Sequence, residues 1–342
     1  MHIPGALDID EWNYESNSKI ALMINRYKKE INYKFAWIIL FTQVLYFPLF
    51  SQELNSTNNN PFIVILGTLQ DGGSPHIGCQ KDCCKHQDPT KKIVSLGLVD
   101  PSENKKFLIE ATPEINNQLK KLDSVSGSKL TNSIDGIFLT HAHIGHYSGL
   151  MYLGKEAWNS NSIPVYAMPK MKLFLENNGP WSQLIKINNI VLNEIEDKKS
   201  TKISDNLIIT PYTVPHRDEF SETVGYKIIG PNKSALFIPD VDKWSKWDMN
   251  ITEIIKEVDY ALIDGTFYGI GELNNRNMAE VPHPLITESM ELFGAMSEKD
   301  RNKIWFIHLN HTNPAMNKNS AEYKMIIDKG FHVASYGQLI SL

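Results

Sequence analysis

The sequence contains little cysteine and no excess of positive charge. Its 342 residues include only three cysteines, and the formal net charge is -5. All three cysteines lie in the hexapeptide "CQKDCC" at 79–84. An odd number cannot complete a disulfide framework, and the vicinal Cys83 and Cys84 do not readily pair with each other. The acidic balance gives no broad basic field for nucleic acid, so we expect no nucleic-acid partner.

Long apolar runs are also scarce, and the one exception lies near the N-terminus. Residues 35–50, "FAWIILFTQVLYFPLF", carry no charge and are shorter than the roughly 20 residues that a spanning helix needs. A basic flank precedes them and a small, polar segment follows from Ser51. This order is typical of a secretory signal peptide with cleavage near Ser51. The alternatives are an uncleaved membrane anchor and a buried helix.

The position of this run predicts how the chain is divided. Signal peptides begin close to the start of a chain, so we expect translation to begin at Met23 and regard residues 1–22 as a doubtful extension. Residues 23–52 would be the signal or anchor, 53–60 a linker and 61–342 one catalytic domain. The protein is therefore predicted to be exported, periplasmic or secreted, with a membrane-anchored form as the alternative.

From residue 61 onward, continuous apolar runs of strand length alternate with helical patterns. The predicted strands are 61–68, 105–112, 134–141, 163–168, 206–214, 224–230, 234–240, 259–265 and 303–309. The predicted helices are 113–122, 148–158, 169–178, 251–258, 284–296 and 320–330. Strands with helices between them indicate a layered α/β protein in which helices cover the sheets.

Several predicted strands end in a side chain that can bind a metal. These side chains are His141, His143 and His146 in "THAHIGH", then His216, Asp240, Asp242, Asp264, His308 and His311. A lone histidine is more often a satisfied polar residue, but loops at strand ends carry chemistry on a rigid scaffold. Imidazole together with carboxylate suits zinc, iron or manganese. The combination predicts one or two divalent metals in an active site.

The order of these residues resembles the metallo-β-lactamase superfamily, over essentially all of 61–342. The resemblance implies an αββα sandwich, two mixed sheets between outer helices. It also implies two metal sites that share one carboxylate. The implied ligands are His141, His143 and His216 for the first metal, His146 and His308 for the second, and Asp240 as the bridge and catalytic carboxylate. Gly145 stands where that superfamily has a further aspartate.

A closer resemblance is to the pyrroloquinoline-quinone biosynthesis protein B family. Its motifs are matched by "LGTLQDGGSPHIGC" (66–79), "THAHIGHYSGLMYLGKEAW" (140–158), "NGPWSQLI" (178–185), "VPHRDEFSETVGY" (214–226), "FIPDVDKW" (237–244), "DGTFY" (264–268) and "FIHLNHTNP" (306–314). Family membership does not define the substrate. An export signal is unusual for a cytoplasmic cofactor pathway, so we interpret the chain as a divergent paralogue.

Gly145 makes two-zinc hydrolysis doubtful, because the second site loses a carboxylate. One possible outcome is a single metal, and another is a second metal rescued by Asp242, Asp264 or His283. A third is an iron site with open positions for O₂, as the oxidative role of the resembling family implies. The last is a degenerate, non-catalytic site. On the sequence alone, Gly145→Asp is predicted to strengthen binding of the second metal.

Four further residues are candidates for supporting roles. Asp242 and Asp264 could support the metal ligands or form turns. His283, in "VPHPL", could reach the pocket or be structural. Arg217 follows His216 and could bind a polar substrate or form a surface ion pair.

The cysteine cluster resembles a feature of a sister branch, the cyclic phosphodiesterases of phosphonate breakdown. That branch has a histidine three residues after the last active-site histidine, here His311. The resemblance implies a structural Cys₃His zinc formed by Cys79, Cys83, Cys84 and His311. His76 and His86 are rival fourth ligands, and free or oxidised thiols are the alternative.

The sequence thus predicts a metallo-β-lactamase-fold enzyme. Its reaction would be hydrolysis or iron-dependent oxidation of a small polar or peptide-derived substrate. The rival interpretations are a phosphodiesterase-type hydrolase with two metals and a non-catalytic metal- or ligand-binding protein. The apolar helix faces are compatible with a homodimer, and contact with a membrane is expected only through the N-terminal segment.

Overall fold

The computed structural model describes residues 59–127, 134–217, 219–273 and 277–342. The apolar run at 35–50, and with it the predicted signal or anchor, lies outside these residues. Within the described ranges, no helix is long and apolar enough to cross a membrane. Residues 59–342 form a single structural unit.

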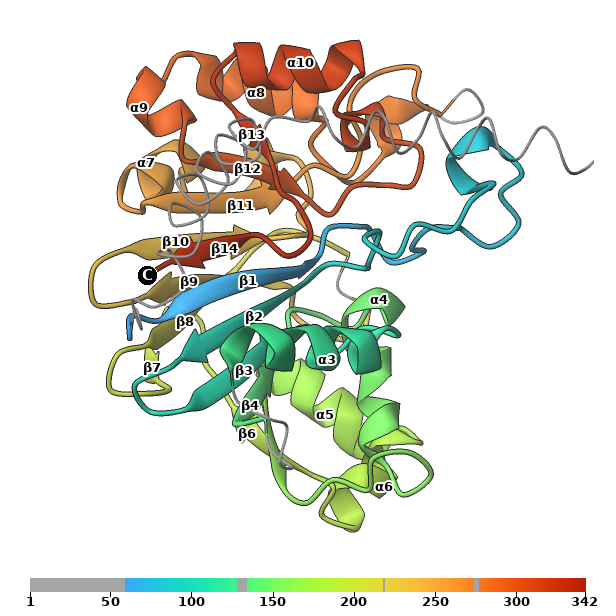
Figure 1. The fold of residues 1–342 in the computed structure, drawn as a ribbon, viewed down its shortest axis with the longest axis vertical. Helices are drawn as coiled ribbons and strands as arrows, with labels where there is room; N and C mark the ends of the chain where they lie inside the picture. Colours follow the sequence, from blue (N-terminus) through green and yellow to red (C-terminus); the bar gives the residue numbers. More distant parts are fainter. Residues whose placement is uncertain (1–58, 128–133, 218, 274–276) are drawn as a thin grey trace, which may run out of the picture. The chain divides into compact units, whose positions relative to one another are not determined.

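Two seven-stranded sheets form the centre of this unit (Figure 1). The first has the order β14-β1-β2-β3-β4-β5-β6, and the second has the order β13-β12-β11-β10-β9-β8-β7. The strands of the first are β1 (Phe62–Gly67), β2 (Ser95–Asp100), β3 (Lys105–Ile109), β4 (Gly136–Phe138), β5 (Ile163–Ala167), β6 (Ile190–Glu194) and β14 (Leu339–Ser341). Those of the second are β7 (Thr201–Lys202), β8 (Ile208–Thr213), β9 (Val224–Ile229), β10 (Ser234–Ile238), β11 (Tyr260–Asp264), β12 (Ile304–Ile307) and β13 (His332–Val333).

Helices cover the outer faces of both sheets. The α-helices are α3 (Ile115–Ser126), α4 (Ile144–Tyr147), α5 (Pro169–Asn177), α6 (Trp181–Lys186), α7 (Ile251–Lys256), α8 (Ile286–Gly294), α9 (Glu298–Arg301) and α10 (Ala321–Asp328). Short 3₁₀ helices are η1 (Asp82–Cys84), η2 (Ser148–Leu153), η3 (Trp244–Lys246), η4 (Met278–Glu280) and η5 (Pro314–Met316). The predicted αββα sandwich, two mixed sheets between outer helices, is confirmed.

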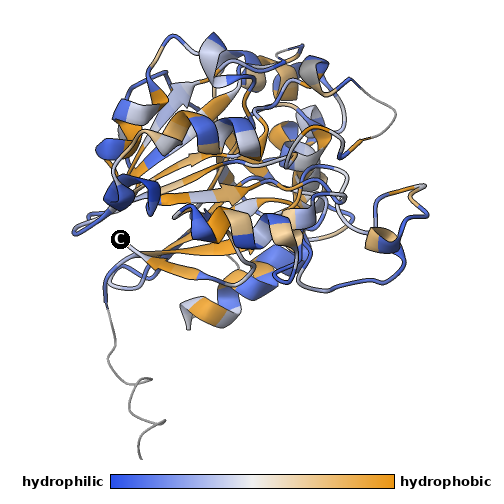
Figure 2. Ribbon diagram, turned by 90° about the horizontal axis from the view of Figure 1, so that it is seen from above, coloured by the Kyte–Doolittle hydropathy of each residue, from blue (hydrophilic) through white to orange (hydrophobic). Residues whose placement is uncertain are grey.

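Three apolar layers hold the sandwich together. The middle layer joins the two sheets and includes Phe107 and Phe138 from the first and Tyr226 and Phe237 from the second. One outer layer packs α3 and α5 on the first sheet, and the other packs α7, α8 and α10 on the second. Because central strands are buried on both faces, their sequences are continuous apolar runs, and they stand out as hydrophobic in Figure 2.

Strand direction brings the functional loops to one edge of each sheet. In the first sheet β3, β4, β5 and β6 run parallel. In the second sheet β10, β11, β12 and β13 run parallel. β8 is antiparallel to β9, which is antiparallel to β10, so β8 also points the same way. The loops that leave their carboxyl ends therefore collect at one edge, as in other open α/β sheets.

The sequence did not predict every element, and one predicted helix is wrong. The short strands β6, β7, β13 and β14 were not predicted, and neither was β2. Residues 148–158 were expected to be helical, but only η2 and following turns form there. The Gly149 N–H donates to Ala111 O at 2.8 Å, so this backbone donor is taken up by the neighbouring segment after β3.

The shared middle layer predicts a large cost for removing one aromatic side chain. Phe237 is fully buried, so Phe237→Ala should lower the free energy of unfolding by about 3–5 kcal/mol. Leu173, on α5, is 56% exposed, and Leu173→Ala should change the free energy of unfolding by less than about 0.5 kcal/mol. Urea denaturation followed by tryptophan fluorescence measures both. Similar losses in the two variants would contradict this description of the core.

Candidate metal centre

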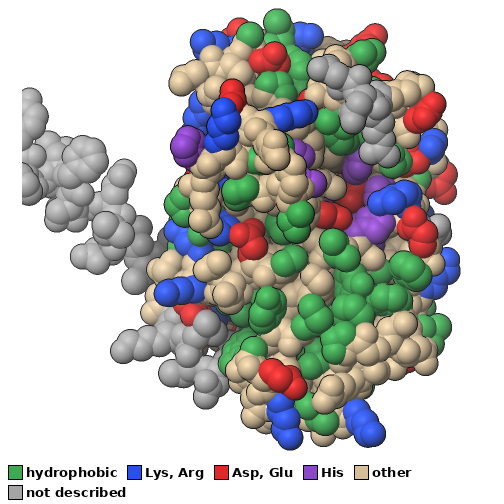
Figure 3. Space-filling model, turned by 90° about the vertical axis from the view of Figure 1, so that its right-hand side faces the viewer, with side chains coloured by type: hydrophobic (Ala, Val, Ile, Leu, Met, Phe, Trp, Pro, Cys, Tyr) green, Lys and Arg blue, Asp and Glu red, His purple; other side chains and the backbone are tan. Residues whose placement is uncertain are grey.

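The predicted metal ligands come together at the edge where the two sheets present their loops. They are His141, His143 and His146 after β4, His216 after β8, Asp240 after β10 and His308 after β12. Figure 3 shows histidine and acidic side chains side by side on one face of the molecule. Rigid strands thus hold side chains from distant parts of the sequence at one place.

One group of donors consists of His141, His143, His216 and Asp240. Their ligand atoms all lie within 4.8 Å of one another. The Asp240 carboxylate is in the middle, with Oδ2 3.3 Å from His141 Nε2 and Oδ1 3.2 Å from His216 Nε2. His143 Nδ1 lies 2.8 Å from His141 Nε2. Three imidazoles and one carboxylate converging in this way suit zinc or iron.

A second group of donors contains a residue that the sequence did not single out. Asp71 joins His146, Asp240 and His308, again with ligand atoms within 4.8 Å of one another. Asp71 Oδ1 lies 2.8 Å from His146 Nε2 and 3.6 Å from His308 Nε2. Asp240 Oδ2 is 3.9 Å from both histidines. Asp240 therefore belongs to both groups and could bridge two metals.

Asp71 occupies the space that a side chain at Gly145 would take. A Cβ added to Gly145 would lie 2.6 Å from Asp71 Cα and 2.7 Å from Asp71 Oδ1. Atoms cannot approach this closely, so the glycine makes room for the carboxylate from the loop after β1. Asp71 lies only four residues beyond the end of β1 at Gly67. Its place after a strand, in "LQDGG", is the same signal that marked the histidines.

A buried carboxylate lies behind His146, one of the two histidines of the second group. Glu110 is fully buried and follows β3 with a positive φ of 76°, a conformation that is costly for a non-glycine residue and common at functional sites. Its Oε1 is 3.3 Å from His146 Nδ1. Burial lowers the pKa of His146, but the carboxylates of Glu110 and Asp71 outweigh it and hold that pKa well above the usual value. A carboxylate behind one ring nitrogen leaves the other free for a metal.

Hydroxyl groups orient two further histidines. Thr266 Oγ1 donates to Asp264 Oδ1 at 2.7 Å and lies 2.8 Å from His308 Nδ1. Because its proton goes to Asp264, Thr266 accepts from His308 Nδ1–H, and His308 Nε2 keeps its lone pair. Thr140 Oγ1 lies 2.8 Å from His141 Nδ1. Both rings thus direct Nε2 toward the donor groups.

The buried atoms of the site fit a bound cation. His216 Nδ1 and Nε2, His308 Nε2 and Asp240 Oδ1 are buried, and no described residue offers them a partner in hydrogen-bond geometry. Buried polar atoms normally have hydrogen-bond partners, so unpaired donor atoms of this kind are expected where a metal ion would bind. Burial lowers the pKa of His141 well below its usual value, which keeps it neutral and able to coordinate. The donors present therefore match divalent metals.

The supporting residues proposed from the sequence fall in different places. Asp264 and His283 lie in the site, where His283 Nδ1 is 2.8 Å from Asp264 Oδ2 and 3.2 Å from Asp240 Oδ1. Burial lowers the pKa of His283, but these two carboxylates outweigh it and raise it to about 9. Asp242 instead pairs with Lys246 at 2.6 Å. Asp242 therefore belongs to none of the donor groups. Asp264 and His283 form a further group with Asp240 and His308, and its ligand atoms also lie within 4.8 Å of one another.

Arg217 lies on the surface beside the site. Its side chain is 57% exposed and is 3.7 Å from Glu219. Glu219 Oε2 is in turn 3.6 Å from His143 Nε2. A surface ion pair thus stands next to the most exposed histidine of the first group.

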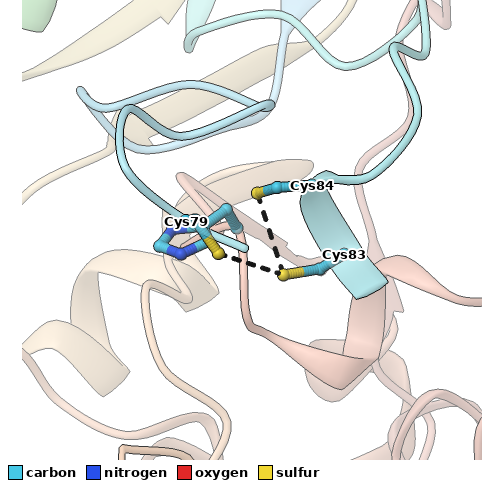
Figure 4. A group of neighbouring side chains, drawn as sticks. Cys79, Cys83 and Cys84 are labelled. Carbon is cyan, nitrogen blue, oxygen red and sulfur yellow. Dashed lines mark hydrogen bonds between the residues drawn. The ribbon is translucent and has the colours of Figure 1, made fainter. Parts of the chain in front are cut away.

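The cysteine cluster forms a separate donor group. The sulfur atoms of Cys79, Cys83 and Cys84 and a ring nitrogen of His311 lie within 4.8 Å of one another. Cys83 Sγ is 3.9 Å from Cys79 Sγ and 3.8 Å from Cys84 Sγ, and Figure 4 shows the three thiols converging. Three sulfurs and one imidazole match a closed structural zinc site.

The rival fourth ligand His76 has a different role. Its ring stacks on that of His311, with centroids 4.3 Å apart, and neither it nor His86 belongs to the donor group.

Burial lowers the pKa of His311 to about 4. Burial and the neighbouring sulfurs raise the pKa of Cys83 to about 11. Without a cation, this group therefore holds a neutral imidazole and a neutral Cys83 thiol.

Comparison with known proteins agrees with this geometry. A β-lactamase superfamily domain matches residues 105–309, more than half of the chain, so the chain belongs to the β-lactamase superfamily. Within it, the chain resembles coenzyme PQQ synthesis protein B. The protein of that name from Acinetobacter baumannii (strain ACICU) is 26% identical over 82% of this chain and 99% of its own length. That from Methylorubrum extorquens (strain PA1) is 23% identical over 82% of this chain and 99% of its own length.

Solved structures support the same fold. The Zn²⁺-bound PqqB from Methylobacterium extorquens has a TM-score of 0.69 at 21% identity, covering 82% of this chain and all of that one. A diphosphatase from the PhnP family has a TM-score of 0.58 at 20% identity, covering 83% of this chain and 97% of that one. The fold and the donor groups together indicate a protein that binds divalent metal.

Asp71 is predicted to be needed for the second metal only. Asp71→Asn should weaken metal binding at the second group at least about ten-fold, because a coordinating carboxylate is lost, and should leave the first group unchanged. Titration with Zn²⁺ under competition from a chelating dye measures both affinities. Asp88→Asn, on the same loop but in an exposed turn with Thr90, is the control. Equal second-site affinity in wild type and Asp71→Asn would remove Asp71 from the ligand set.

The structure reverses the effect expected of Gly145→Asp. An aspartate there collides with Asp71, so the single substitution should weaken second-metal binding at least about ten-fold. The double variant Asp71→Gly with Gly145→Asp should recover it, because one carboxylate again fills the shared space. The same titration compares wild type, both single variants and the double variant. If Gly145→Asp alone binds the second metal as tightly as wild type does, the two positions do not compete for the same space.

Proposed function

We propose that the chain is a hydrolase that holds two divalent metals and acts on a small polar substrate. The observation that carries the proposal is the position of Asp71, whose Oδ1 lies 2.8 Å from His146 Nε2. This carboxylate supplies what Gly145 removes from the second donor group. Metals held by these two groups would supply Lewis acidity, which activates a water and polarises the group that is cleaved.

The protein's own residues would bind the metals at the buried centre and the substrate at the open side of the site. Asp240 faces both donor groups: its oxygens lie 3.2 Å from His216 and 3.3 Å from His141 in the first group. Its Oδ2 also lies 3.9 Å from His146 and His308 in the second group. Its burial, with 3% of its surface exposed, keeps it out of water and strengthens its electrostatic effect. On the open side, Arg217 and Glu219 offer charges of both signs to a polar substrate.

A second candidate is iron-dependent oxidation of an amino-acid- or peptide-derived substrate. Similarity to proteins named coenzyme PQQ synthesis protein B, over 82% of this chain, favours it. The first donor group also supports it, because histidine with carboxylate and open positions suits Fe(II). In this case one metal in the first group would be enough.

Metal content and turnover of the same preparation distinguish these functions. Full-length protein purified without added metal is analysed for zinc, iron and manganese by mass spectrometry. It is then tested for hydrolysis of bis(p-nitrophenyl) phosphate, and for oxygen consumption with a tyrosine-containing peptide. We expect two active-site metals and phosphodiester hydrolysis, which Asp240→Asn should lower at least about 100-fold because both donor groups lose a ligand. The control is Asp88→Asn, which should keep full activity.

The outcomes separate the candidates. One iron per chain with oxygen consumption would replace the hydrolase by the oxidative enzyme. Zinc in the cysteine group alone, with no turnover of either kind, would indicate a binding protein on the same fold.

A further inference from the structure

Two short segments of the chain contribute to both the cysteine group and the second donor group of the metal centre. The segment after β1 supplies Asp71 to the second group and the three cysteines to the cysteine group. The segment after β12 supplies His308 to the second group and His311 to the cysteine group. The two groups are therefore linked through the same pair of segments.

In the part of the chain that the structure describes, the backbone hydrogen bonds between the two segments lie next to their strands. Leu309 N donates to Thr68 O at 2.8 Å, and Gln70 N donates to Leu309 O at 3.0 Å. These bonds hold the segment as far as Gln70, one residue before Asp71. The Asp71 carboxylate has polar contacts with His146 and His308, which are themselves candidate ligands.

Beyond Asp71, the loop has little apolar packing to hold it. Most of its side chains from 71 to 84 are exposed or half-buried, and Ile77 is 94% exposed. Figure 1 shows this part of the chain with η1 extending away from the sheets. Among the described residues, this part of the loop contacts the segment after β12 through the stacking of His76 on His311 and through the cysteine group. Cys84, which accepts from His76 N at 3.2 Å, is its buried residue.

We propose that Cys79, Cys83, Cys84 and His311 are positioning residues for the second active-site metal. A zinc ion held by them ties the loop after β1 to the segment after β12 and so holds Asp71 beside His308. The first donor group takes no ligand from either segment. Loss of the cysteine-bound zinc should therefore weaken the second metal selectively. The inference rests on the proposed two-metal function in one respect, that both donor groups bind metal.

The test uses the full chain and Mn²⁺ as the probe. Mn²⁺ prefers oxygen and nitrogen donors to thiolates, so it reports on the metal centre without filling the cysteine group. Zinc content is measured by mass spectrometry, and Mn²⁺ binding by electron paramagnetic resonance titration. The variants are Cys79→Ser, which removes a ligand, and Cys79→His, which keeps one. Gln80→Ser, at the neighbouring exposed position, is the matched control.

Once their active-site metals have been exchanged for Mn²⁺, we expect wild type and Gln80→Ser to carry one zinc and two Mn²⁺. Cys79→Ser should lack the zinc and bind the second Mn²⁺ at least about ten-fold more weakly, the usual effect of losing support for a metal ligand, with the first Mn²⁺ unchanged. Cys79→His should recover both zinc and the second Mn²⁺. If Cys79→Ser does not fold, His311→Gln removes a ligand from the other segment and should give the same selective loss.

Two results would overturn the proposal: one leaves the two-metal function intact, and the other overturns that function as well. A zinc-free Cys79→Ser or His311→Gln protein that binds both Mn²⁺ ions as wild type does would disprove the positioning role and leave the two-metal function intact. Wild type that binds a single Mn²⁺ would overturn the two-metal function together with the inference built on it.

Discussion

The close approach of Asp71 to the backbone of Gly145 is the constraint on which the metal centre depends. A carboxylate is needed near His146 and His308, and only one side chain can occupy that space. An ideal Cβ at 145 would lie 2.6 Å from Asp71 Cα, so the glycine and the aspartate require each other. The requirement links the turn after β4 to the loop after β1, two segments 74 positions apart in the sequence.

Burial of charge explains why the site is built as it is. Asp240 and Glu110 are almost completely shielded from water, and an unpaired buried carboxylate costs several kcal/mol. Burial raises the pKa of Asp240, but His216, His283 and His308 outweigh it and keep that pKa well below its usual value. The site is thus a cluster of carboxylates and imidazoles that is stable only when protons or metal ions offset its charges. Divalent cations would offset the negative charge of the buried carboxylates, which apolar side chains cannot do.

The strands carry the second constraint. Parallel strands end at the same edge of their sheet, so a histidine after β8 and one after β12 meet without being near in sequence. This is why apolar runs followed by His or Asp were enough to predict a layered α/β protein with a metal site at its strand ends. The αββα sandwich and the division of the ligands between two metals were implied by the resemblance to the metallo-β-lactamase superfamily. The short edge strands β7 and β13, each of two residues, carry too few residues for any apolar pattern. Residues 148–158 appeared helical because apolar residues recur there, but the hydrogen bond from Gly149 to Ala111 depends on a neighbour that periodicity does not show.

The sequence by itself indicated a layered α/β protein, candidate His and Asp ligands at its strand ends, and the closeness of the three cysteines, because these depend on local spacing and on strand ends. The αββα class of fold came from the family resemblance. The partner of Gly145 was decided by the tertiary structure alone. Residues 71 and 145 are far apart in the sequence but adjacent in the fold. Only the structure therefore shows that Asp71 fills the space left by the absence of a side chain at Gly145. The same holds for the cysteine group, because the path of the segment after β12 brings His311, rather than His76 or His86, into the set of donors.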